Sequence, residues 1–205
     1  MTIRLHRGDL PDLSAYKGAV AIDTEAMGLD PHRDRLCVVQ LSPGDGSADV
    51  VQIGAGQRKA PNIERLLADK SILKIFHFAR FDMGLLAKAF GVMAAPIYCT
   101  KIASRLARTY TDKHGLKDLA REVLGVDLSK QQQLSDWGAD DLTDAQVSYA
   151  ATDVLHLHAL KEKLDAMLAR EGRADLAAAC FRFLPDRARL DLAGWAAEDI
   201  FSHSS

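Results

Sequence analysis

The sequence predicts an α/β domain with a mixed central sheet, which contains an antiparallel meander and is flanked by helices. Two observations predict it. Apolar runs at residues 18–24, 36–41 and 48–53 are separated by short connections, as expected for successive antiparallel strands. From residue 72 onward, strand-like and helix-like segments alternate, which is typical of parallel βαβ units. One sheet should therefore contain both strand orientations.

Length and composition indicate an ordinary soluble domain. The chain has 205 residues, of which 48% are hydrophobic and 26% charged, enough for one well-formed core. No apolar run approaches the length that spans a bilayer, and residues 1–7 lack the apolar segment of a signal peptide, so we expect no membrane partner. Three cysteines without paired spacing (Cys37, Cys99 and Cys180) indicate no disulfide framework, and we expect a cytoplasmic location.

The charge distribution restricts how the chain can hold a polyanion. The net charge is −2 and the pI about 6.4, whereas proteins that grip long nucleic acids are usually basic. Any such site must therefore be local. Residues 101–121 are the basic candidate, and a solvated helix face is the alternative. The segment carries Lys101, Arg105, Arg108, Lys113, Lys117 and Arg121 against Asp112 and Asp118.

In the N-terminal half, residues 2–6 alternate as in an edge strand, and residues 18–24 form the predicted central strand. The turn at residues 42–46 joins the next two strands. The loop at residues 54–61 lacks the third glycine of a dinucleotide-binding loop, so we reject that interpretation. A short helix is predicted at residues 62–68.

The second half alternates strands and helices. We predict strands at 72–77 and 95–99 and helices at 82–90, 101–108 and 115–124, followed by a polar stretch at 129–141. A long final helix should start at the capping box formed by Thr143 and Gln146. Its apolar positions recur at helical spacing and should face the sheet. They are Val147, Ala150, Val154, Leu157, Leu160, Leu164 and Leu168.

Two carboxylates stand at the end of the central strand. Residues i and i+2 of a strand share a face, so Asp23 and Glu25 project side by side. Burial and mutual repulsion should raise their pKa values unless a cation lies between them. Hard oxygen ligands suit Mg²⁺ or Mn²⁺. The alternative is a solvated strand end with two surface acids.

Further candidates come from the helices. Asp82 is predicted to open a helix, where the helix dipole favours an anion. Tyr149 and Asp153 are four residues apart and share one face of the final helix. The alternatives are a packing role for Tyr149 and a surface position for Asp153. Strand ends and helices of one sheet thus bring four carboxylates together.

The pattern resembles the tyrosine variant of the Asp-Glu-Asp-Asp superfamily of 3′-5′ exonucleases, and within it ribonuclease D. The three core motifs are Asp23-Thr24-Glu25, Phe76-His77-Phe78-Ala79-Arg80-Phe81-Asp82 and Tyr149-Ala150-Ala151-Thr152-Asp153. Further similar segments occur in the family's order at residues 82–86, 99–106, 115–119, 130–137 and 142–149. The resemblance covers residues 13–168. A chain of this length is most similar to the compact nanoRNase C type.

The resemblance implies a ribonuclease H-like fold and hydrolysis of short single-stranded RNA, down to dinucleotides, to nucleoside 5′-monophosphates. It implies two Mg²⁺ ions, or Mn²⁺, which clamp the scissile phosphate and are bound by Asp23, Glu25, Asp82 and Asp153. Tyr149 would orient the attacking water. The implied substrate contacts are Met27, Gly28, Leu29, His77, Arg80, Lys101 and Arg105. Packing within the loop is an equally open alternative for Leu29 and Met27, and a core position is an equally open alternative for His77.

Other functions remain as alternatives. Trimming of structured RNA 3′ ends, as by ribonuclease D, and 3′-5′ digestion of single-stranded DNA are the enzymatic ones, and an RNA-binding module that lost catalysis is the third.

We predict an exonuclease domain at residues 1–170 and a helical tail at 171–205, which either packs on the domain or forms a homo-oligomer contact. The tail is apolar, so we favour the oligomer. Its apolar residues include Phe181, Phe183, Leu184, Leu190, Leu192, Trp195, Ile200 and Phe201.

Overall fold

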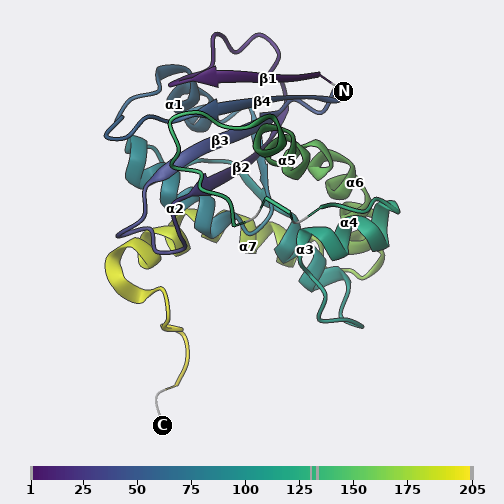
Figure 1. The fold of residues 1–205 in the computed structure, drawn as a ribbon. Helices are drawn as coiled ribbons and strands as arrows, with labels where there is room; N and C mark the ends of the chain where they lie inside the picture. The colour runs from purple at the N-terminus through teal and green to yellow at the C-terminus, as the bar shows by residue number, and fades with distance from the viewer. Residues whose placement is uncertain (1, 130, 133, 204–205) are drawn as a thin grey trace.

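The computed structural model describes residues 2–129, 131–132 and 134–203 and shows a six-stranded sheet between two groups of helices (Figure 1). The strand order is β1-β4-β3-β2-β5-β6. The strands are β1 (Thr2–Arg7), β2 (Ala19–Ala26), β3 (Leu36–Ser42), β4 (Ser47–Gln52), β5 (Leu73–Phe76) and β6 (Ile97–Cys99). β2, β3 and β4 form an antiparallel meander, while β1, β5 and β6 pair with their neighbours in parallel. The predicted mixed sheet is confirmed.

Helices cover both faces of the sheet. They are α1 (Pro61–Ala68), α2 (Ala79–Phe90), α3 (Thr100–Ala107), α4 (Leu116–Leu124), α5 (Asp144–Leu155), α6 (Leu157–Arg170) and α7 (Ala174–Leu190), followed by the short η1 (Asp191–Trp195). Successive residues of β2 enter opposite cores, as strand geometry requires. Ile22 packs in the core with α1, α2 and α7, and Ala21 packs in the core with α5 and α6.

The prediction of one long final helix from Thr143 is wrong in one respect, because this segment forms two helices. The capping box of Thr143 and Gln146 is present, but α5 ends at Leu155 and α6 begins at Leu157. The apolar stripe stays buried across the break, from Ala150 to Leu168. α5 covers the meander strands, whereas α6 packs on α3 and α4. These different neighbours, rather than a helix-breaking residue, account for the change of direction.

The C-terminal segment folds back onto the domain in its first half. In Figure 1, α7 lies on the opposite side of the sheet from α5, and the last described residues leave the body of the molecule. α7 packs on α2, α3, α6 and β6, and the Phe181 ring lies 4.6 Å from that of Tyr98. Leu184 is buried, whereas Trp195 and Phe201 are exposed. Among the described residues, no helix has the length and apolarity to span a bilayer.

Candidate active site

The end of β2 brings three carboxylates together. Asp23 and Glu25 share one face of β2, and Asp153 reaches them from α5, which covers that face. One oxygen from each of the three lies within 4.8 Å of the others. The register of β2 against β3 shifts between Glu25 and Ala26, and such bulges often re-aim side chains at functional sites. The predicted convergence of these three residues is confirmed.

Tyr149 lies one helical turn before Asp153 on α5. Its ring packs 6.1 Å from the buried ring of Trp137, which holds the phenol in place. Burial and the charge of Asp153 raise the pKa of Tyr149 above its usual range, while the phenol offsets only part of the rise that burial and Asp23 cause in the pKa of Asp153. The hydroxyl is therefore neutral at working pH, able to donate a hydrogen bond but unsuited to act as a base.

Asp82 approaches from the other face of the sheet. It lies in the first turn of α2, which begins at Ala79, three residues earlier than predicted. The carboxyl is 3% exposed and accepts a 2.6 Å hydrogen bond from the hydroxyl of Thr24. Its charge interacts with those of Asp23 and Glu25, although it is not within the three-carboxylate cluster. Asp82 is therefore the fourth member of the site, set apart from the other three.

The electrostatics of the cluster are those of a site built for cations. Burial raises the pKa of Asp23 to about 7, of Asp153 to about 8 and of Glu25 to about 9. The charge of Asp23 adds to the rise at Glu25 and Asp153, and burial places the pKa of Asp82 well above its usual value. The predicted upward shifts are confirmed. Clustered carboxylate oxygens are the donor set that Mg²⁺ and Mn²⁺ prefer, so these residues fit such a metal.

The raised pKa values predict how metal binding depends on pH. Each carboxyl holds its proton to a higher pH in the folded than in the unfolded chain. The contribution of each protonated carboxyl to folding stability is therefore complete below about pH 4. It is lost as pH rises through the pKa values of the folded chain, about 7 to 9. Metal competes with these protons. The increase in Tm caused by Mg²⁺ over chelator should grow from pH 6 to pH 9 in matched buffers. An increase that shrinks over this range would contradict the assignment.

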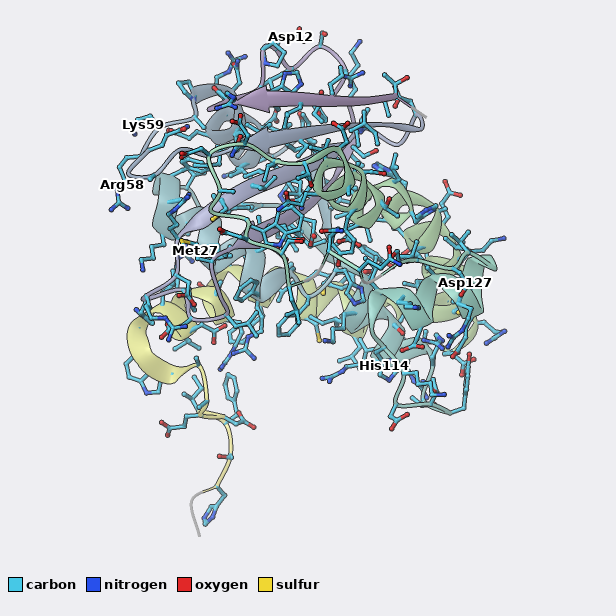
Figure 2. The ribbon with its side chains drawn as sticks, in the orientation of Figure 1. Asp12, Met27, Arg58, Lys59, His114 and Asp127 are labelled. Atoms are coloured by element: carbon cyan, nitrogen blue, oxygen red, sulfur yellow. The ribbon has the colours of Figure 1, made fainter. Side chains whose placement is uncertain are left out.

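Asp23, Tyr149 and Asp153 line a cavity of about 300 Å³, here called the carboxylate cleft. Several predicted substrate contacts lie in or near it. His77 and Lys101 line it. Met27, on the loop after β2 (Figure 2), is 59% exposed, and Leu29 of the same loop is 86% exposed. Gly28 has a structural explanation, because a Cβ atom there would lie 2.2 Å from the Asp34 carboxylate. Exposure of Leu29 is consistent with contact to a ligand, and its role stays a prediction.

His77 is a neutral side chain. Thr100 donates its hydroxyl proton to the carbonyl of Phe76, at 3.2 Å, so its oxygen is left to accept a bond from Nδ1 of His77, at 2.9 Å. Burial, and next the positive charge of Lys101, lower the pKa of His77 to about 3. Nε2 has no hydrogen-bond partner among the described residues. An ionic contact between His77 and phosphate is therefore no longer expected.

The basic surface predicted from residues 101–121 is smaller than expected. Arg108 is fully buried between α3 and α4 and pairs with Glu122, so its inclusion in a surface was wrong. Arg121 pairs with Asp118. Outside this segment, Arg80 pairs with Asp191 of η1, with Nε 2.7 Å from Oδ2, and Lys130 is not among the described residues. Lys101 and Lys117 remain as basic residues of the carboxylate cleft.

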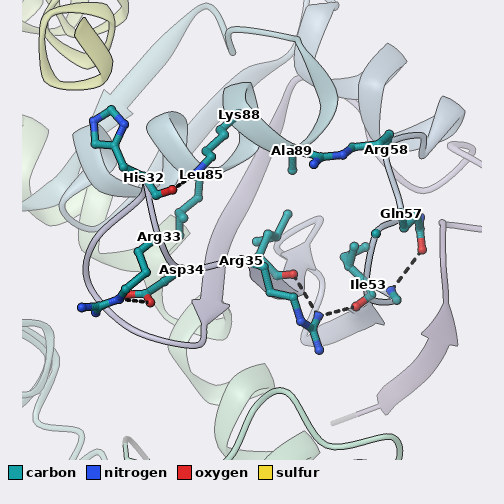
Figure 3. Close-up of a pocket in the computed structure, with 13 residues that line it drawn as sticks. His32, Arg33, Asp34, Arg35, Ile53, Gln57, Arg58, Leu85, Lys88 and Ala89 are labelled. Atoms are coloured by element: carbon teal, nitrogen blue, oxygen red, sulfur yellow. Dashed lines mark hydrogen bonds and ion pairs between the residues drawn. The ribbon is translucent and has the colours of Figure 1, made fainter. Parts of the chain in front are cut away.

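Another cavity of about 300 Å³ lies between α2 and the loops before β3 and after β4 (Figure 3). Its lining is basic, but most of the charges are satisfied within the chain. Arg33 pairs with Asp34, and Arg35 and Lys88 donate to backbone carbonyls. The carboxylate cluster found among the described residues lies elsewhere. We therefore place the chemistry at the carboxylate cleft.

Three residues of the site were not predicted from the sequence to have an individual role in it. Thr24 stands between Asp23 and Glu25 and points to the opposite face, a position that strand alternation could have assigned. Trp137 packs on Tyr149. Gln40 faces Asp23 across the β2–β3 ladder, fully buried, and neither end of its amide has a partner among the described residues. A buried amide without a partner is costly, so Gln40 is well placed to interact with the carboxylates.

Removing the Thr24 hydroxyl should disturb the site without unfolding the chain. Thr24→Val keeps the side-chain shape but removes the hydrogen bond that holds Asp82. Residues behind metal ligands typically contribute about 10- to 100-fold to activity or metal affinity, and we expect a loss in that range. The Mg²⁺ concentration at half-maximal rate should rise. Thr24→Ser keeps a hydroxyl and should restore most of the rate. A Thr24→Val enzyme with unchanged Mg²⁺ dependence would show that the Thr24 hydroxyl does not position Asp82 for metal binding.

Comparison with known proteins agrees with this geometry. A family model described as 3′-5′ exonuclease matches residues 10–169. Ribonuclease D of Gluconacetobacter diazotrophicus is 36% identical over 169 residues, which cover 82% of this chain and 42% of that protein. The chain thus spans less than half the length of this curated relative.

Several solved structures match over the full chain. NrnC of Brucella melitensis with bound Mg²⁺ is 62% identical with a TM-score of 0.96, and the match covers 100% of both chains. The same protein bound to pGG is 63% identical with a TM-score of 0.97 and equal coverage. The mixed sheet with helices on both faces is thus the ribonuclease H-like exonuclease fold. The chain belongs to the 3′-5′ exonuclease family that includes ribonuclease D and NrnC.

Proposed function

We propose that this chain is a metal-dependent 3′-5′ exoribonuclease that hydrolyses short RNA oligonucleotides, down to dinucleotides, to nucleoside 5′-monophosphates. The observation that carries the proposal is the cluster of Asp23, Glu25 and Asp153. Its support comes from a full-length likeness to NrnC, which has been solved with Mg²⁺ and with pGG. Two ions would be held by the four carboxylates, with Asp23 serving both, Glu25 and Asp153 serving one, and Asp82 serving the other.

Divalent ions, Mg²⁺ or Mn²⁺, would supply charge stabilisation at the scissile phosphate and acidify the attacking water. The chain's own residues hold the reactants. The neutral hydroxyl of Tyr149 orients the water by a hydrogen bond. Lys101 offers a positive charge to a phosphate at the wall of the cleft. Leu29, exposed on the loop after β2, contacts a terminal base, and Met27 assists it.

The charge around the cleft supports a preference for short substrates. Affinity for a long strand comes largely from many phosphate contacts, and each contact adds a salt dependence of roughly −0.7 in log affinity per log salt for single strands. Arg108 and Arg121 are paired within the chain, and the net charge is −2. Binding should therefore involve few phosphates and weaken only gently with salt.

Turnover of labelled RNA and DNA oligomers, from two to about twenty nucleotides, tests the proposal with Mg²⁺ and with Mn²⁺. The expected result is the highest kcat/KM for diribonucleotides that carry a 5′ phosphate, and a much lower value without that phosphate. A kcat/KM that rises steadily with length and ignores the 5′ phosphate would favour trimming of structured RNA. Equal or faster turnover of DNA would favour a single-strand DNA exonuclease.

A homo-oligomer is also proposed, formed through the exposed apolar residues Trp195, Ile200 and Phe201. Truncation after Arg170 is a poor test, because it would strip Leu184 from the core. The double variant Trp195→Ser with Phe201→Asp should instead give a smaller mass in light scattering. Leu5→Ser, which alters an exposed apolar residue of β1, is the matched control. An unchanged mass of the tail variant would contradict the contact.

The location we propose is the cytoplasm. The support is the state of the three cysteines, all of which are free thiols in the structure. Free thiols are the rule in a reducing compartment. Microscopy of the tagged chain checks this location, and a signal confined to the cell envelope would contradict it.

A further inference from the structure

The segment that leads into α5, residues 134–141, forms neither a helix nor a strand and is here called the strap. It carries Trp137, which is 3% exposed and belongs to the apolar core beneath α5. The ring of Trp137 lies 6.1 Å from that of Tyr149. The strap therefore supplies the surface on which the Tyr149 ring rests.

Trp137 depends on the strap for its position. Its Nε1 atom is buried and has no hydrogen-bond partner among the described residues. No directional contact from that atom fixes the indole, so packing and the course of the strap backbone determine where the ring lies. A shift of the strap would move Trp137 and, with it, the support of Tyr149.

The backbone of the strap is held from the sheet by Gln52. Gln52 is the last residue of β4 and shares with Val50 the face of that strand that α5 covers. Its side chain is largely buried, and Nε2 donates to the carbonyls of Ala139, at 2.8 Å, and Asp140, at 3.1 Å. One amide on a rigid strand thus holds two successive peptide units, which begin two residues after Trp137.

Neighbouring contacts hold the strap on its other sides. Arg35, the residue before β3, donates to the carbonyl of Gly138, at 3.1 Å, and Gln146 of α5 donates to that of Asp136, at 3.1 Å. A Cβ atom on Gly138 would lie 3.2 Å from the sulfur of Met27, so the strap also lies against the loop after β2. The strap is therefore fastened to the sheet and to α5 on both sides of Trp137.

We propose that Gln52 is a positioning residue for the reaction: by holding the strap it fixes Trp137 and thereby aims the hydroxyl of Tyr149. The inference rests on the proposed function. Gln52 acts through the strap and Trp137 rather than by contact with the reacting atoms. Small displacements of a group that orients a reactant are costly to rate, so kcat rather than KM should depend on Gln52.

The kinetic test removes the donor and keeps the bulk of the side chain. Gln52→Met should lower kcat for a 5′-phosphorylated diribonucleotide about tenfold at nearly unchanged KM. In the Tyr149→Phe background the same change should have almost no effect, because the hydroxyl that the strap aims is already absent. Gln57→Met is the matched control and should leave kcat unchanged. The amide of Gln57 also donates to backbone carbonyls, those of Gly8 and Lys59, which lie outside the strap.

The fluorescence of Trp137 reports on the strap without turnover. The chain has two tryptophans, and Trp195→Phe leaves Trp137 as the one that emits. In this background Gln52→Met should increase quenching by acrylamide, because a loosened strap exposes the indole, whereas Gln57→Met should not. If Gln52→Met does not melt cooperatively, Arg35→Lys is the second variant. It removes the guanidinium that donates to the strap, and the same kinetic and quenching results are expected.

The outcomes separate this inference from the proposed function. An unchanged kcat, or equal losses in the parent and in Tyr149→Phe, would overturn the inference, because Gln52 would then not act through the hydroxyl. A lower kcat with unchanged quenching of Trp137 would overturn it as well. A Tyr149→Phe enzyme as fast as the parent would overturn this inference alone and leave the proposed function intact. A parent inactive with Mg²⁺ on every RNA would overturn the proposed function, and this inference with it.

Discussion

Replacing Asp23 by alanine should remove nearly all hydrolysis. Loss of one hydrogen-bond donor to a developing charge costs about 10² to 10³ in rate, and loss of a metal ligand should cost on the order of 10³-fold or more. Asp23 should show the largest effect, because it is the carboxylate shared between the two proposed ions. Glu25→Ala, Asp82→Ala and Asp153→Ala should follow closely. Single-turnover rates at saturating Mg²⁺ measure these losses.

The same four variants should remain folded. Each removes a carboxyl, half-buried or, for Asp82, buried, whose ionisation is opposed by desolvation and by its neighbours, so without metal the alanine variants should melt at or above the temperature of the parent. Melting in the presence of chelator at about pH 8 checks this. Full activity of any variant, or activity of the parent in excess chelator, would contradict the metal site.

Replacing Tyr149 by phenylalanine should lower kcat on the order of 10²-fold at nearly unchanged KM. The ring keeps its packing on Trp137, so the fold is not affected. Since the phenol of Tyr149 has a raised pKa and stays neutral in the working range, the shape of the pH–rate profile should not change. Steady-state kinetics between about pH 6 and 9 separate these quantities. A Tyr149→Phe enzyme as fast as the parent would return Tyr149 to a packing role.

Much of the site follows from local periodicity. Alternation along a strand put Asp23 and Glu25 on one face, and helical spacing put Tyr149 one turn from Asp153. The capping box fixed the start of the helix that carries them. These features are local, because each depends on residues within one turn or one strand. The motifs then connected the segments, and the structure brings Asp153 onto Asp23 and Glu25.

Pairings between distant segments could not be predicted from the sequence. Thr24 holds Asp82 across 58 residues, and Arg80 reaches Asp191 across 111. Arg108 looked like one more surface cation, yet tertiary packing buries it against Glu122. The periodicity of a sequence does not predict which partner a long side chain contacts. A cavity lined by Ile102 of α3 and Phe183 of α7 is of the same kind, since its walls come from segments far apart in the chain.

The most direct test of the account is anomalous scattering from crystals grown with Mn²⁺ and an uncleavable 5′-phosphorylated diribonucleotide. The account predicts two peaks beside the scissile phosphate. One should contact Asp23, Glu25 and Asp153, and the other should lie beside Asp23 and toward Asp82. A bound dinucleotide without any Mn²⁺ peak at Asp23, Glu25 and Asp153 would contradict metal-dependent hydrolysis at this site.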